Sequence, residues 1–197
     1  MNFLAHLYLS GSDQSIMIGN FIADSVKGKE VLQYSSEIQK GVQLHRFIDQ
    51  YTDTHTIIHE AKQIIAPYFG KYNAVVLDIY MDHFLAKDWS SYSSVKLSAF
   101  ASVVYEILQE EIHALPQRVQ ELLPYMIRQD WLSNYANFEG LDLVFRGMSK
   151  RAAFESHMED ATGILREHYA EMQQCFDLFF PQLVRASTIR LKEITLL

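Results

Sequence analysis

Apolar side chains recur three or four residues apart through most of this 197-residue chain. The clearest example lies between Lys71 and Asp88, where the recurring residues are Tyr72, Val75, Val76, Ile79, Tyr80 and Phe84. This spacing is typical of an amphipathic helix, whereas a half-buried strand alternates apolar and polar residues. The chain has only 8 Gly and 4 Pro, fewer than a turn-rich β-sandwich needs. The sequence therefore predicts an all-α fold.

Other segments with helical spacing or capping residues lie on both sides of this one. We expect them at about 14–23, 36–51, 94–113, 117–135, 137–147 and 151–179, with one more helix closing before Gly70. Pro116, Pro124 and Pro181 are expected to bend or end the helices that contain them. The tail from Arg185 to Leu197 has no clear assignment and is expected to be loosely attached.

Length and composition favour a single domain. Hydrophobic residues make up 49% of the chain, which is enough for one continuous core. No internal repeat and no linker rich in Pro, Gly and Ser divides the sequence, so we interpret residues 1–197 as one domain. The single cysteine, Cys175, cannot form an internal disulfide, which favours a reducing, cytoplasmic location.

Charge and hydropathy disfavour two classes of partner. A net charge of -7 disfavours non-specific binding to nucleic acid, which requires a basic surface. The apolar stretch from Phe3 to Leu9 contains His6 and follows no basic segment, so it is not expected to be a signal peptide. No run of about 18 apolar residues is present to span a membrane. The oligomeric state is left open by the sequence.

Aspartate and histidine are concentrated in the first 85 positions, in short blocks among apolar residues that helices would bury. Burying a charged group is costly unless it is paired or bound to a metal. Imidazole and carboxylate groups are common ligands of divalent metals. The pattern therefore predicts a metal-dependent hydrolase.

Two of these blocks place polar groups one helical turn apart. His45 and Asp49 would share a helix face and could offer two ligands to one ion, with Arg46 beside them to contact a phosphate. Asn20 and Asp24 would likewise lie together, where they could bind a metal and orient its water. The alternatives are a simple His–Asp hydrogen bond on a half-buried helix and an ordinary polar helix end.

A third block is the most acidic. Asp78 and Asp82 share one row of a helix, and His83 lies about 100 degrees further around its axis. Two carboxylates and an imidazole can bind a metal or act as general acid and base, although Asp78 could simply be solvated. His6 has apolar neighbours, so it is a candidate ligand or a satisfied core histidine.

Taken in order, the blocks resemble the motifs of the acyl carrier protein phosphodiesterase family. The matching segments are MNFLAHL at Met1–Leu7, GNFIADSVKG at Gly19–Gly28, GVQLHRFID at Gly41–Asp49 with TDTH at Thr52–His55, and DHFLA at Asp82–Ala86 with Trp89. One departure is Thr56, where many members are expected to have proline. The resemblance implies a helical fold related to the HD phosphohydrolases with its elements permuted. It also implies a manganese-type divalent cofactor and hydrolysis of the phosphodiester that joins 4'-phosphopantetheine to a serine of acyl carrier protein.

The resemblance also implies a set of site residues. The expected metal ligands are His6, Asp24, His45 and Asp82. The catalytic roles are hypotheses from the chemistry of the side chains: Asp24 or Asp49 would orient or deprotonate water, His83 would protonate the departing serine alkoxide, and Arg46 would steady the phosphate. Substrate binding is assigned to Asn20, Lys27 and Lys29.

An acidic carrier protein needs a local basic patch on this acidic chain. Lys27 and Lys29 are the first candidates because they follow Asp24, and the cluster Arg146, Lys150 and Arg151 is the second. Two other functions remain open at this stage. One is an HD-like phosphohydrolase that acts on a nucleotide or another small phosphoester, and the other is a helical binding module without activity.

Overall fold

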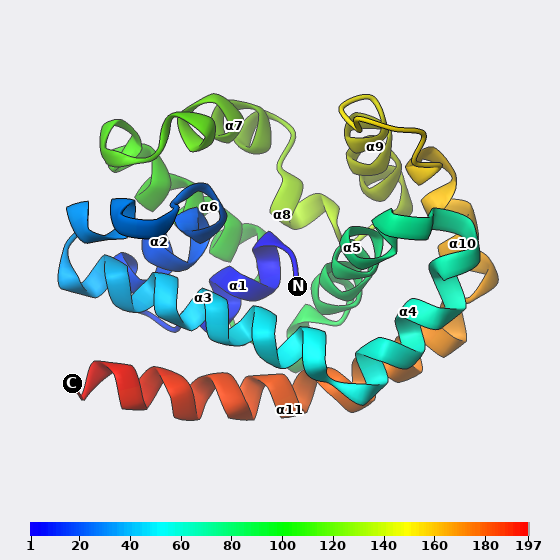
Figure 1. Cartoon of the computed structure of the whole chain (residues 1–197), viewed down its shortest axis with the longest axis horizontal. Coiled ribbons are helices and arrows are strands. Elements are labelled where there is room, and N and C mark those ends of the chain that lie inside the picture. The colour runs from blue at the N-terminus through cyan, green and yellow to red at the C-terminus, as the bar shows by residue number, and fades with distance from the viewer. Residues whose placement is uncertain (197) are drawn as a thin grey trace.

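The computed structural model describes residues 1–196, and its regular structure within this range consists of helices without strands (Figure 1). The α-helices are α1 Phe3–Leu9, α2 Gln14–Ile22, α3 Ser36–Thr54, α4 Thr56–Phe69, α5 Asn73–Lys87, α6 Leu97–Glu110, α7 Gln117–Arg128, α8 Trp131–Asn134, α9 Phe138–Ser149, α10 Ala161–Glu167 and α11 Tyr169–Thr195. The predicted all-α fold is confirmed.

The short helix α1 lies in the middle of the molecule, between α2 and α5 and behind α3 (Figure 1). Its residues Leu4, Ala5 and Leu7 are fully buried, and the apolar core around them extends from Met1 to Ile194. Among the described residues, no helix combines the length and the hydropathy that crossing a bilayer requires. The central position of α1 means that any polar side chain on it faces other helices.

Two predicted helices are interrupted. The helix expected at 117–135 is divided into α7 and α8, because Asp130 adopts a left-handed conformation with φ of 41°. The helix expected at 151–179 begins only at Ala161, and His168 then separates α10 from α11. Spacing of apolar residues does not reveal such breaks, since the apolar pattern continues through them.

The last helix corrects two further predictions. Pro181 lies inside α11 and does not end it, and the tail expected to be loose is helical as far as Thr195. Leu183 and Ile194 are buried against the core. Burial of this apolar face stabilises the helix beyond the proline, although proline removes one backbone hydrogen bond.

Helices α2 and α3 cross in direct backbone contact at Gly19 and Gly41. A Cβ atom added to Gly41 would lie 2.8 Å from the Cα of Gly19 and 2.8 Å from the backbone nitrogen of Asn20, closer than Cβ contacts occur in proteins. A Cβ atom added to Gly19 would meet the carbonyl group of Ile38. Because His45 follows Gly41 by one helical turn, this crossing brings His45 next to Asn20.

We expect the substitution Gly41→Ala to destabilise the fold, because the new methyl group would push two backbones apart. Overpacking of this kind costs about 3 kcal/mol, which corresponds to a fall in Tm of roughly 10 °C for a chain of this size. Thermal unfolding followed by circular dichroism measures the effect.

Gly163→Ala in α10 is the matched control, because a Cβ atom there meets nothing within 4 Å. Alanine is favoured over glycine inside a helix, so the Tm of this variant should equal or exceed that of the native chain. Similar Tm values for the two variants would contradict the importance of the crossing.

Candidate metal centre

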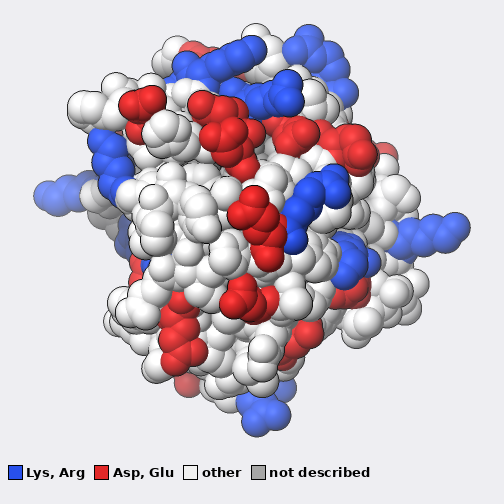
Figure 2. Space-filling model, turned by 90° about the vertical axis from the view of Figure 1, so that its right-hand side faces the viewer, with Lys and Arg blue, Asp and Glu red and all other residues white. Residues whose placement is uncertain are grey.

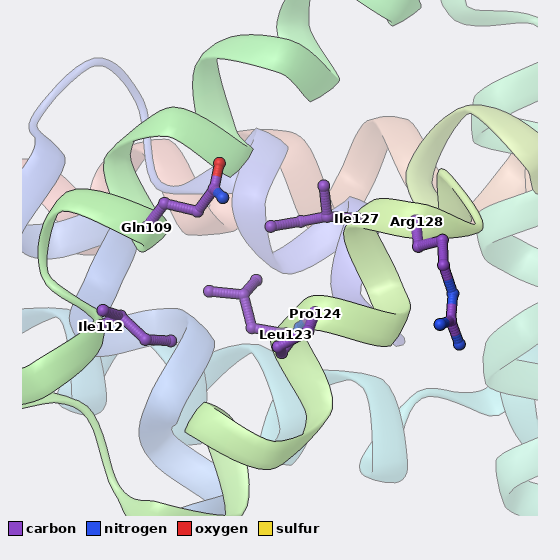
Figure 3. Close-up of a pocket in the computed structure, with 6 residues that line it drawn as sticks. All are labelled: Gln109, Ile112, Leu123, Pro124, Ile127 and Arg128. Carbon is purple, nitrogen blue, oxygen red and sulfur yellow. The ribbon is translucent and has the colours of Figure 1, made fainter.

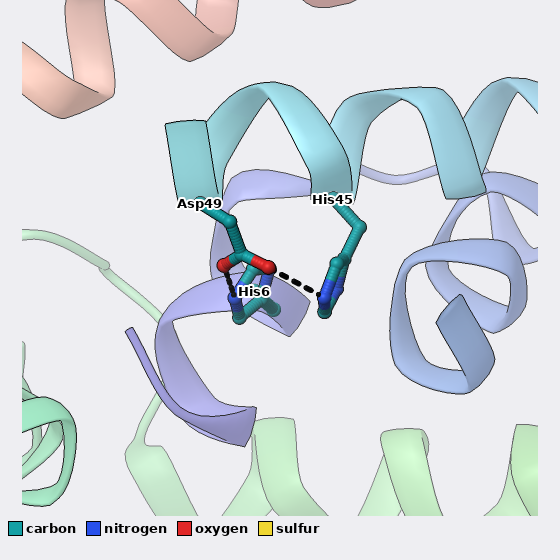
Figure 4. Close-up of side chains that lie close together, drawn as sticks. All are labelled: His6, His45 and Asp49. Atoms are coloured by element: carbon teal, nitrogen blue, oxygen red, sulfur yellow. Dashed lines mark ion pairs between the residues drawn. The ribbon is translucent and has the colours of Figure 1, made fainter. Parts of the chain in front are cut away.

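Three potential metal ligands from α1 and α3 converge on one another (Figure 4). They are His6, His45 and Asp49, which can each offer a ligand atom within 4.8 Å of the others. The Asp49 carboxylate faces both imidazoles, with Oδ1 at 3.2 Å from His6 Nε2 and Oδ2 at 3.0 Å from His45 Nε2. The two imidazole rings stack with their centroids 4.0 Å apart. The predicted pairing of His45 and Asp49 on one helix face is therefore present, and His6 completes it.

Asn20 determines how both imidazoles are oriented. Its side-chain oxygen lies 2.8 Å from His6 Nδ1 and 3.1 Å from His45 Nδ1, and its backbone oxygen lies 2.8 Å from His45 Nδ1. Since these are acceptor oxygens, we infer that both Nδ1 atoms carry hydrogen. Both Nε2 atoms consequently point toward Asp49. Histidine ligands of metals are commonly fixed through the other ring nitrogen in this way.

This position of Asn20 favours a role other than the predicted one in substrate binding. Its side chain is completely buried, and its amide nitrogen donates to the backbone oxygen of His6 and to Ser10 Oγ, each at 2.9 Å. In this structure Asn20 has no exposed surface for a substrate to contact. Asn20 instead holds the two histidines. Ser10, which the sequence analysis did not single out, is also buried and donates to the His6 backbone oxygen at 2.8 Å. A lone serine before a turn carries no sequence signal for this contact.

Asp24 joins the cluster from its exposed side. Its Oδ1 lies 3.3 Å from His45 Nε2, and 82% of its side-chain surface is exposed. Burial by itself lowers the pKa of His45, but hydrogen bonds with Asp24 and Asp49 outweigh burial and raise this pKa to about 9. Burial raises the pKa of Asp49, while His45 and His6 lower it well below its usual range. The centre therefore concentrates negative charge around two imidazoles.

The donor set fits a divalent metal ion. The buried Nε2 atom of His6 has no hydrogen-bond partner, although it lies near Asp49. Burial is also the main cause that lowers the pKa of His6, so this nitrogen is available as a neutral ligand. Two imidazole nitrogens and a carboxylate are the ligand types found in catalytic sites of zinc and related metals.

Asp82, predicted to be a metal ligand, does not belong to this cluster. It is completely buried, and its two oxygens accept hydrogen bonds from the backbone nitrogens of Leu4, at 2.7 Å, and Ala5, at 3.2 Å. Burial raises the pKa of Asp82 to about 7, against the lowering effect of the N-terminal amino group and these backbone donors. Both oxygens are thus already engaged by helix α1. This geometry favours a role for Asp82 other than that of a metal ligand.

His83, predicted to be a general acid, also lies elsewhere. Its Nδ1 lies 2.8 Å from the backbone oxygen of Tyr135, and its Nε2 lies 3.0 Å from the hydroxyl of Tyr169. The side chain is buried, and burial lowers its pKa. His83 connects α5 to the region after α8 and to α11. Both of its ring nitrogens thus have partners outside the metal centre, and its role as a general acid stays a prediction.

The predicted cationic residues are exposed. Arg46 follows His45 on α3, while Lys27 and Lys29 flank Gly28 at the start of a short 3-10 helix, Gly28–Gln33. Within the described part of the chain, none of the three forms an ion pair with a carboxylate. They are free to meet an anionic substrate.

Two surface grooves lie away from the cluster. A groove of about 340 Å³ lies on α6 and α7, where it is lined by Gln109, Ile112, Leu123, Pro124, Ile127 and Arg128 (Figure 3). A second groove, of about 310 Å³, lies between α3 and α11. None of the cluster residues lines either groove. Access to the cluster is instead through Asp24 and Asp49, whose side chains are 82% and 40% exposed.

Comparison with known proteins gives one consistent family. The family model described as acyl carrier protein phosphodiesterase matches residues 1–183. Proteins of that name from Photorhabdus laumondii and Yersinia pestis are 32% and 30% identical to the chain, over 93% and 94% of its length. These alignments cover 93% and 96% of the two relatives. A relative of the same name from Klebsiella pneumoniae is 31% identical over 94% of the chain and 96% of its own length. No solved structure matches the chain.

Proposed function

Because the chain belongs to the acyl carrier protein phosphodiesterase family, we propose that it hydrolyses holo-acyl carrier protein to apo-acyl carrier protein and 4'-phosphopantetheine. The observation that carries the proposal is the convergence of His6, His45 and Asp49 inside the segments that the family model matches. A phosphodiester carried by a folded protein needs an accessible site. The exposed edge of the cluster at Asp24 and Asp49 meets that need.

We infer that His6 and His45, through their Nε2 atoms, and Asp49 hold a divalent ion, with Asp24 as a further ligand on the exposed side. Manganese is the ion that the family resemblance implies. Such an ion lowers the pKa of a bound water and neutralises charge on phosphoryl oxygens. The fold related to the HD phosphohydrolases stays a prediction from the sequence.

The protein's own groups supply binding and orientation. The hydrogen bond from His45 lowers the pKa of Asp24, which makes this carboxylate a weak base that is suited to orienting the attacking water. Arg46 lies on the exposed side of α3, one residue from His45, and its guanidinium can bind a phosphate through two hydrogen bonds. Asn20 keeps both imidazoles in place throughout.

Docking of the carrier protein is assigned to Lys27 and Lys29. Lys27 follows Asp24 by three residues, so its Cα lies within about 11 Å of the Cα of Asp24. Figure 2 shows a different face, on which basic side chains gather near the top, at the level of α9, with acidic side chains directly below them. The cluster Arg146, Lys150 and Arg151 belongs to the end of α9 and the residues after it. We prefer Lys27 and Lys29 as the docking residues because they lie close to Asp24 in the sequence.

The test is mass spectrometry of holo carrier protein after incubation with this protein and Mn²⁺. We expect the mass to fall by that of the 4'-phosphopantetheine group and the apo carrier to accumulate. A panel of nucleotides and small phosphoesters, incubated in parallel, should show far slower turnover. Hydrolysis of a nucleotide with an unchanged carrier would favour the alternative phosphohydrolase, and no turnover of any compound would favour a binding module.

A further inference from the structure

Helix α1 does not supply its own N-terminal cap. Asn2, the residue before the helix, makes no side-chain hydrogen bond to it. The first backbone N–H groups of a helix have no partner within the helix, and Leu4 and Ala5 are completely buried, so water cannot satisfy these groups. An acceptor from another element is therefore required.

The acceptor is the carboxylate of Asp82, a residue on α5 that is distant from α1 in the sequence. Each of its oxygens accepts one N–H group, from Leu4 and Ala5, across 78 and 77 positions of sequence. One turn earlier on α5, Asp78 binds the amino group of Met1 at 2.9 Å. Two carboxylates of α5 thus hold the backbone of residues 1–5.

The next residue in the chain is His6. The contacts of its imidazole depend on where the backbone of α1 lies, because the ring meets Asn20 at 2.8 Å and stacks on His45. The peptide unit that carries His6 begins at Ala5, whose nitrogen is bound to Asp82. The Asp82 carboxylate therefore controls where the His6 backbone lies relative to α3.

We propose that Asp82 is a positioning residue for the metal centre, acting through helix α1 on His6 and not as a ligand. The effect that this proposal predicts on catalysis rests on the proposed function. Its structural part, the control of His6 by Asp82, can be measured independently of turnover.

The test is Asp82→Asn, which keeps the size of the side chain but replaces one acceptor oxygen with a donor that faces a backbone N–H. The imidazole nitrogens are followed by NMR in the metal-free protein, and the His6 signals are assigned from their loss in His6→Gln. We expect the His6 signals to shift while those of His83 stay in place. Asp88→Asn, on the C-terminal side of α5 where Asp88 binds Gln173, is the matched control and should leave the His6 signals in place.

Displacement of His6 should also weaken metal binding and lower turnover. We expect the Kd for Mn²⁺, measured by calorimetry, to rise about tenfold or more, and kcat on holo carrier protein to fall about 10- to 100-fold, as when other outer contacts of metal ligands are removed. KM for the carrier should stay unchanged, because Asp82 has no exposed surface at which the carrier could contact it. A merely structural role would lower Tm without changing these quantities well below Tm.

Three outcomes separate the possibilities. Unshifted His6 signals in folded Asp82→Asn, with native Mn²⁺ affinity and kcat, would overturn the proposal. If the native protein neither binds Mn²⁺ nor hydrolyses the carrier, the proposed function fails, and the His6 signals alone decide whether Asp82 positions this residue. If Asp82→Asn does not fold, replacing the Ala5 amide by an ester removes one donor and leaves the carboxylate intact. The same shift of His6 is then expected, and its absence would overturn the proposal.

Discussion

Replacing His45 by alanine is expected to lower kcat for hydrolysis of holo carrier protein by about 10³-fold, a loss of about 4 kcal/mol of transition-state stabilisation. His45 is the residue that meets every other member of the centre, since its ring contacts Asn20, Asp24 and Asp49 and stacks on His6. Its removal deletes one ligand and leaves two carboxylates without their common partner. Steady-state kinetics on holo carrier protein measures the effect.

His113→Ala is the control for this prediction. His113 is exposed in a short 3-10 helix, Ile112–Ala114, outside the centre, so its loss should change kcat less than twofold. Far-UV circular dichroism should show native helix content in both variants. If His113→Ala were as damaging as His45→Ala, or if His45→Ala simply unfolded, the assignment of the centre would be wrong.

Removing divalent metal is expected to abolish turnover to a similar extent, about 10³-fold or more. Without an ion, the exposed Asp24 and Asp49 carboxylates face the phosphodiester directly and repel it. Dialysis against a chelator followed by a turnover assay measures the loss, and added Mn²⁺ should restore activity.

The fold should survive this treatment. The imidazoles are held by Asn20 and the helices by apolar contacts, so far-UV circular dichroism of the metal-free protein should match that of the loaded protein. Full turnover by metal-free protein in the presence of chelator would refute the metal centre. Loss of activity together with loss of helix content would instead indicate a structural ion.

The helices could be predicted from sequence because each one depends on local spacing. The α2, α3 and α5 segments fall within a few residues of their expected bounds. The helix predictions that were wrong depend on backbone conformation and on contacts between distant residues, which local spacing does not reveal. Asp130 breaks a helix through its backbone conformation, and the chain beyond Pro181 stays helical because Leu183 and Ile194 pack on distant helices.

In the metal centre, too, local spacing predicts some contacts and not others. The pairing of His45 with Asp49 follows from a separation of four residues on one helix, and the sequence predicted it. The contacts of Asp82 and His83 did not follow, because spacing places them on α5 without showing what they face. Asp82 meets a backbone 78 residues away and His83 meets Tyr135, and such encounters depend on the packing of whole helices.

The crossing of α2 and α3 at Gly19 and Gly41 affects which sequence changes this chain can accept. Because main-chain atoms of Gly19 and Gly41 touch, the separation of these helices is set by atomic radii that no side chain can change. Substitutions at Leu44 or Ile48, which fill the interior beside the crossing, can alter the local volume without moving His45 relative to Asn20. The interior can therefore diverge over evolution while the geometry of the metal centre is retained, provided that the two glycines remain.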